Sequence, residues 1–224
     1  MLSTIAIVPS APVLVPELAS TAAAELTGLR EAVFAAAGSL PPRWVAVGVG
    51  PAGDVIGPER AGTFAGYGVD LPVGLSPGAD VRGELPLCAL VAGWLRGVAA
   101  PRARAEVRVF SADLDADAAL EYGRGLRTEF DGSDAVGLLV VADGAHTLTP
   151  QAPGGYDPES IPVQDALADA LAAGDAAALM RLPRTVVGRV AYQVLAGVGT
   201  PRSAEEFYRG APYGVGYFVG VWQP

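Results

Sequence analysis

Residues 135–146 read AVGLLVVADGAH, and this stretch indicates the class of fold. The uninterrupted apolar run over residues 135–142 is typical of a strand that is buried on both faces, as in the sheet of an α/β protein. A polar turn, Asp143-Gly144-Ala145-His146, follows it directly. Because ligands of open α/β sheets collect at the carboxyl ends of strands, this turn is where we expect a site.

Strand and helix patterns alternate on both sides of this stretch. Strands are predicted at residues 2–8, 43–50, 106–110 and 213–222, with one short strand near 63–67. Helices are predicted at residues 17–37, 85–99, 113–130, 158–173, 176–182 and 185–196. Residues 51–83 are rich in Gly, Pro and Asp, and loops of this length are usually functional or irregular.

No internal repeat, low-complexity tract or linker divides residues 1–224. We therefore expect a single domain. The alternating elements predict a three-layer α/β/α sandwich around a central, mostly parallel or mixed sheet. The glycines of the last strand, Gly214, Gly216 and Gly220, are expected to mark a close backbone approach or a bulge rather than strand ends.

The composition limits the class of protein further. Hydrophobic residues make up 51% of the 224 residues and charged residues 17%, which excludes general disorder. A net charge of −9 argues against a nucleic-acid partner or an anionic membrane surface. The apolar start lacks a basic residue and is interrupted by prolines, unlike a signal peptide. We expect a cytoplasmic protein with no membrane partner, and a homo-oligomer is compatible with the sequence.

Rare residue types restrict the chemistry. His146 is the only histidine and Cys88 the only cysteine, so one chain cannot build a disulfide, a zinc ribbon or a site with two histidine ligands. The sequence contains no lysine, which removes Schiff-base chemistry and a Walker-type phosphate lysine. We therefore predict no metal and no other cofactor.

Two interpretations of the Asp143–His146 turn remain open. In the first, the His146 imidazole acts as an acid or base near neutral pH and Asp143 orients it. In the second, Asp143 caps the turn and His146 is an ordinary loop residue. In the loop that follows, Tyr156 could line a pocket beside His146, and Asp157 is the expected N-cap of the next helix.

Four segments, in this order, carry a resemblance to a known family. They are IVPSAPVLVPEL at 7–18, VGVGPAGD at 47–54, VVADGAHTLTPQAPGGYDPE at 140–159 and APYGVGYFV at 211–219. They resemble the subunit-B group of class III extradiol ring-cleavage dioxygenases (LigB-like), which includes the Memo proteins. The resemblance covers most of the chain and implies an α/β sandwich around a central sheet.

The chain departs from the family at the iron ligands. Ser10 stands where the resemblance implies a first ligating histidine, Gly53 lies near the place of the second, and Gly210 lies near the place of the third ligand. His146 does match, and the resemblance implies an acid/base role for it. No G-x-S-x-G elbow surrounds Ser10, so it is expected to be an ordinary turn serine rather than a nucleophile.

Three functions follow as hypotheses. The first is a pseudo-dioxygenase without iron, whose family pocket binds a small molecule or a protein partner. The second is a metal-independent enzyme that uses His146 with Asp143 on a small aromatic or acidic substrate. The third is an active dioxygenase in which other residues replace the iron ligands. Serine is a poor iron ligand, and glycine has no side-chain ligand atom. The expected cleft places His146 among the pocket residues Ser10, Gly53, Asp54, Tyr156, Gly210 and Tyr213.

Overall fold

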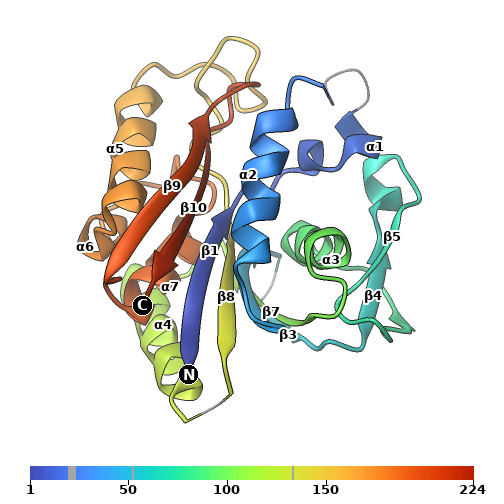
Figure 1. Ribbon diagram of the computed structural model, residues 1–224. Coiled ribbons are helices and arrows are strands. Elements are labelled where there is room, and N and C mark those ends of the chain that lie inside the picture. Colours follow the sequence, from blue (N-terminus) through green and yellow to red (C-terminus); the bar gives the residue numbers. More distant parts are fainter. Residues whose placement is uncertain (20–23, 52, 133) are drawn as a thin grey trace.

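A computed structural model describes residues 1–19, 24–51, 53–132 and 134–224. It contains a seven-stranded mixed sheet of order β3-β7-β2-β8-β1-β10-β9 and a small sheet of order β5-β4-β6 (Figure 1). The strands are β1 (Leu2–Val8), β2 (Arg43–Gly50), β3 (Asp54–Ile56), β4 (Arg60–Thr63), β5 (Pro72–Gly74), β6 (Val81–Arg82), β7 (Arg104–Ser111), β8 (Val136–Val141), β9 (Ser203–Gly210) and β10 (Tyr217–Gln223). The predicted α/β class is confirmed.

The centre of the large sheet is parallel and its two sides are antiparallel. Strands β7, β2, β8 and β1 run parallel to one another. Strand β10 then pairs antiparallel with β1, and β9 pairs antiparallel with β10. Strand β1 therefore lies between β8 and β10, two strands that occur much later in the sequence. At the opposite edge, the short strand β3 pairs antiparallel with β7.

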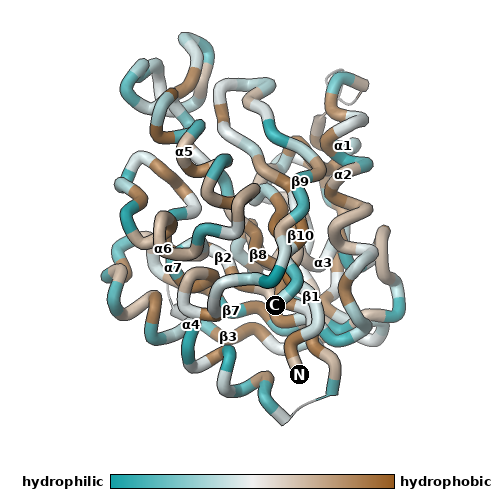
Figure 2. The backbone as a smooth tube through the Cα atoms, turned by 60° about the vertical axis from the view of Figure 1, so that its left-hand side comes forward, coloured by the Kyte–Doolittle hydropathy of each residue, from teal (hydrophilic) through white to brown (hydrophobic). Residues whose placement is uncertain are grey.

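Helices cover both faces of this sheet. They are α1 (Pro16–Ala19), α2 (Thr27–Gly38), α3 (Leu87–Ala99), α4 (Ala116–Phe130), α5 (Ser160–Ala173), α6 (Ala176–Leu179) and α7 (Arg189–Val198). Successive residues of β1 point to opposite faces: Ala6 packs in the core with α2 and α3, whereas Ile5 and Ile7 pack in the core with α4, α5 and α7. Figure 2 shows the hydrophobic colour along the central strands between these layers.

Most of the predicted elements are present, with changes at their ends. The bounds of β1 and β2 are those predicted from the sequence, and β7 and β8 differ from prediction by one or two residues at each end. The last strand begins only at Tyr217, because Gly214 adopts a left-handed turn (φ 74°) before it. The register of β10 shifts between Val219 and Gly220, as expected for a bulge.

Three predictions were wrong. The segment 64–67 is a 3-10 helix capped by the Thr63 hydroxyl, which accepts from the Ala65 N–H, and the strand precedes it. The helix predicted over 17–37 is two helices, α1 and α2, and residues 20–23 of that prediction lie outside the described part. Asp157 is not the N-cap of α5, because that position is Glu159; the Asp157 carboxylate accepts from the Glu159 N–H. Strand β9 was not predicted.

Helices α4 and α7 pack so closely that their backbones are in contact. A Cβ atom added to Gly123 of α4 would overlap the carbonyl oxygen of Val194 and lie 2.7 Å from the Cα of Gly197, both in α7. A Cβ added to Gly197 would likewise overlap the carbonyl oxygen of Leu120. Glycine at both positions is therefore what allows these helices to pack this closely.

Among the helices of the described residues, none combines the length and the apolar character needed to cross a membrane.

Candidate functional site

Three neighbouring parallel strands end at the same edge of the sheet, and each is followed by a predicted site segment. Ser10 follows β1, Asp143 follows β8 and Pro51 follows β2. The sheet order β2-β8-β1 makes these segments neighbours although they lie far apart in the sequence. The expectation that the Asp143–His146 turn lies at a strand end is therefore confirmed.

The Asp143–His146 turn is held from two sides. The Ala145 N–H donates to the Gln164 Oε1 of α5 (2.9 Å). The Gly144 N–H donates to the Gly216 carbonyl, and the Gly216 N–H donates to the Ala145 carbonyl, both at 2.8 Å. A Cβ added to Gly144 or to Gly216 would overlap the Gln164 amide, so a side chain at either position would displace that amide from the Ala145 N–H. The turn is rigidly placed by these bonds.

Asp143 is bound to Ser10. The backbone N–H of Ser10 donates to Asp143 Oδ1 at 2.8 Å, across 133 residues of sequence. Part of Asp143 stays accessible, but protein atoms surround the carboxyl group on most sides, and this burial raises its pKa from 3.8 to about 7. The Ser10 hydrogen bond opposes the shift without cancelling it. Asp143 is thus a carboxyl group that exchanges its proton near neutral pH.

The charge of Asp143 also affects the pKa values of two nearby tyrosines. Burial, and after it the charge of Asp143, raises the pKa values of Tyr192 and Tyr217 far above the ordinary range. The Tyr192 hydroxyl donates to the Ala142 carbonyl at 3.0 Å, directly before Asp143. Both phenols therefore stay protonated next to Asp143 and are neutral hydrogen-bonding groups.

His146 lies beneath the loop that follows it. A Cβ added to Gly154 would come within 2.6 Å of the ring atoms Cδ2 and Nε2, and the Gly154 N–H donates to the His146 carbonyl at 3.0 Å. The buried Nδ1 atom has no hydrogen-bond partner in the described part of the chain. No hydrogen bond joins His146 to Asp143 within that part, so the carboxylate is bound to Ser10 and does not orient the ring.

The other predicted site residues fall in different places. The Tyr213 hydroxyl donates to Glu25 Oε2 at 3.0 Å, and Tyr156 is 52% exposed. Gly53 lines a pocket against β7 and α4, whereas Gly210 lines a pocket between α5 and β9. Ala52, in the turn after β2, lies outside the described residues. The structure thus brings Ser10 into contact with Asp143, whereas Tyr213, Tyr156, Gly53 and Gly210 lie in separate places.

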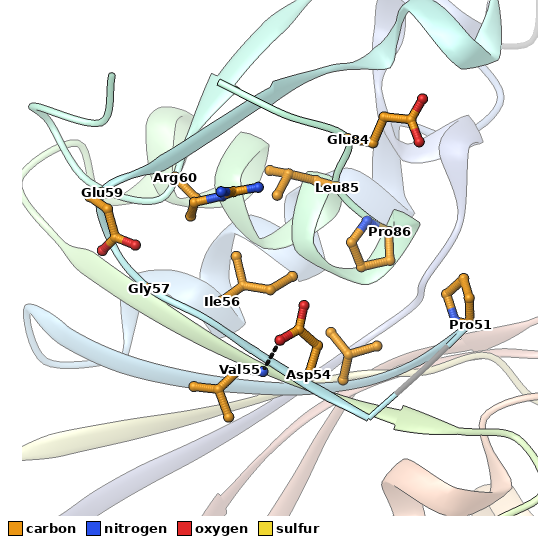
Figure 3. A pocket seen from close by; sticks show the side chains of 11 residues that line it. Pro51, Asp54, Val55, Ile56, Gly57, Glu59, Arg60, Glu84, Leu85 and Pro86 are labelled. Carbon is orange, nitrogen blue, oxygen red and sulfur yellow. Dashed lines mark hydrogen bonds between the residues drawn. The ribbon is translucent and has the colours of Figure 1, made fainter. Parts of the chain in front are cut away.

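A cavity of about 520 Å³ lies beside the turn after β2 and is lined by Pro51 and Asp54 (Figure 3). Strand β3 forms one wall, and the residues that lead into α3, including Leu85 and Pro86, form the other. In Figure 3 the Asp54 carboxyl group, which accepts from the Val55 N–H at 2.8 Å, points into the space between these walls. We call this space the β3 cavity.

The β3 cavity gathers charged side chains that sequence reasoning missed. Glu59, Glu84 and Arg60 line it together with Asp54. None of these four forms an ion pair with another residue of the described chain. Asp54 was among the predicted site residues, and Glu59 and Arg60 come from the Gly- and Pro-rich region 51–83 predicted as a long loop. The length of that loop was the signal that pointed to a site.

The residues at the three expected iron positions do not fit an iron ion. Gly53 and Gly210 have no donor atom in a side chain, and the Ser10 backbone is already bound to Asp143. Within the described residues there is no group of three or more His, Cys, Asp or Glu side chains placed to hold a metal. Iron sites of this class need imidazole and carboxylate ligands that converge on one point.

We therefore expect protein produced with added iron to contain far less than one iron per chain. The reason is the chemistry of Ser10, Gly53 and Gly210, which offer neither imidazole nor carboxylate. Elemental analysis of the purified protein, before and after a chelator wash, measures the content. About one tightly bound iron per chain after the wash would contradict this prediction.

Comparison with known proteins supports the fold alone. No protein-family model matches the chain, and no curated protein matches it. Solved structures do match: the crystal structure of an uncharacterized protein, JW3007, from Escherichia coli K12 superposes with a TM-score of 0.58. The match covers 99% of this chain and 100% of that chain at 12% sequence identity. At this identity the similarity shows a shared α/β architecture.

Proposed function

We propose that this chain is a LigB-like protein without iron that binds a small molecule, and that the β3 cavity is its binding site. The observation that carries the proposal is the cavity itself, with four charged side chains that lack ion-pair partners among the described residues. Its volume of about 520 Å³ is in the range of small-molecule sites. It also lies at the carboxyl end of β2, where α/β sheets bind ligands.

The charges favour one class of ligand. Three carboxylates and one guanidinium line the cavity, so its potential is negative and a purely anionic ligand is disfavoured. A zwitterion can place its carboxylate on Arg60 and its ammonium group near Asp54 or Glu84. Ile56 and Leu85 offer apolar surface for the rest of the molecule. The best-fitting ligand is therefore a small zwitterion with an apolar or aromatic body.

A matched set of probes tests this assignment. Phenylalanine carries both charges, phenethylamine only the positive one and phenylpropionate only the negative one. We expect phenylalanine to bind best. Phenylpropionate should bind worst, because it has no ammonium group to pair with the three carboxylates of the cavity and its own carboxylate is repelled by them. Titration followed by amide chemical shifts measures the three affinities.

Arg60→Gln should remove the preference for phenylalanine over phenethylamine, a loss of about tenfold for a charge-assisted pair. Arg82→Gln is the control, because Arg82 has the same charge but lies outside the β3 cavity. Equal binding of phenylpropionate and phenylalanine, or no shifts near Asp54 and Leu85 with any probe, would contradict the proposal.

A second candidate function is metal-independent acid–base catalysis. The observation in its favour is the pKa of Asp143, raised by burial to about 7, because a general acid or base works best when its pKa is near the working pH. Asp143 would then carry the proton, and His146, with Nδ1 unpaired among the described residues, would be a second proton-exchanging group. This reading moves the central role from His146 to Asp143.

A further inference from the structure

A second cavity, of about 300 Å³, lies between α5 and the end of β9. Its walls are mainly apolar, formed by Leu148, Ile161, Ala168 and Ala211. It shares no lining residue with the β3 cavity. We call it the α5 cavity.

One buried polar side chain lines the α5 cavity. Gln164 is only 9% exposed, and its Oε1 atom accepts from the Ala145 N–H at 2.9 Å. Its amide nitrogen donates to no acceptor among the described residues. The amide lies beside Gly144 and Gly216, where a Cβ on either glycine would overlap it, and the Ala145 N–H holds its Oε1 atom. A donor that lines an apolar cavity and has no partner among the described residues favours a ligand that brings an acceptor.

The charges at the rim restrict that ligand. The Arg209 guanidinium is already bound to Glu206 and to Asp169 (2.7 Å). The Asp165 carboxylate lines the cavity and has no ion-pair partner in the described chain. Carboxylates therefore outnumber the single cation here, and an anionic ligand would be repelled.

We propose that the α5 cavity binds a small, neutral carbonyl compound with a single ring. The carbonyl oxygen accepts from the Gln164 amide nitrogen, and the ring packs against Leu148, Ile161 and Ala168. A volume of about 300 Å³ suits one ring with a short substituent, at the lower end of the range for small-molecule sites. This site is independent of the zwitterion site in the β3 cavity.

Benzamide and benzoate are the probes, because they share shape and differ in charge. We expect benzamide to shift the amide signals of Ala145 and of α5, and benzoate to bind about tenfold more weakly or not at all. Arg60→Gln, in the β3 cavity, should leave benzamide binding unchanged. Absence of benzamide shifts at millimolar concentration, or equal binding of benzoate, would overturn the proposal.

Two variants locate the bound molecule. Gln164→Glu keeps an oxygen for the Ala145 N–H but removes the amide donor, and it should weaken benzamide about tenfold. Ala211→Trp fills the cavity and should abolish binding, whereas Ala173→Trp, on an exposed position of α5, should not. If Gln164→Glu does not fold, the pair of tryptophan variants decides: equal binding by both would overturn the site.

Discussion

Replacing Gly123 with alanine is expected to lower the free energy of unfolding by about 3 kcal/mol or more, as severe overpacking does. The added methyl group would overlap the carbonyl oxygen of Val194 and crowd the backbone of Gly197. Backbone atoms in the middle of α7 cannot move aside as the end of a flexible side chain can. The two helices would have to separate, which opens the core that they share with β8.

Urea unfolding of the variant and the wild type measures this difference. Gly125→Ala is the matched control, because Gly125 belongs to the same helix and its added Cβ meets nothing within 4 Å. This control should stabilise the protein by about 0.5–1 kcal/mol through helix propensity. Similar effects of the two substitutions would show that α4 and α7 do not touch at Gly123.

Replacing Asp143 with asparagine is expected to change how stability depends on pH. The folded protein holds the Asp143 proton up to a pKa of about 7, compared with an ordinary value of 3.8, so folding favours the protonated form. The stabilisation is fully present below about pH 4 and is lost as the pH rises through 7. The wild type should therefore lose up to about 4 kcal/mol over this range that the variant, which cannot titrate, retains.

Asparagine keeps an Oδ1 atom to accept the Ser10 N–H, so the bond to the turn after β1 is preserved in the variant. Unfolding in urea at several pH values between 4 and 8, for both proteins, gives the difference directly. If the free energies of unfolding of the wild type and the variant differ by the same amount at every pH, Asp143 has an ordinary pKa. That outcome would also remove the basis of acid–base catalysis by this residue.

Two of the strands that sequence reasoning placed most closely are largely buried. Residues 136–141 and most of 43–50 are buried, and their continuous apolar runs have one interpretation in an α/β protein. Strand β9 reads SAEEFYRG and was missed, because it is an edge strand whose side chains are mostly half-buried or exposed. Its pairing with β10 comes from the partner strand rather than from its own pattern.

The site was predictable in location but not in its bonds. A polar turn after the most apolar strand predicts a site at the sheet edge, and the structure places the turn at that edge. The partner of Asp143 is a backbone N–H 133 residues away, and the place of Gln164 between two glycines depends on how α5 docks. Such contacts are set by tertiary packing, which no local pattern of residues encodes.

The position of β1 between β8 and β10 also determines when the large sheet can form during synthesis. As the chain leaves the ribosome, residues 2–8 emerge more than 120 residues before their partners on either side, residues 136–141 and 217–223. Until residue 223 is released, at least one edge of this apolar strand has no partner and can pair with another nascent chain. The large sheet can close only after residue 223 has emerged, so overexpression on crowded polysomes would favour aggregation, and slower synthesis would favour the native fold.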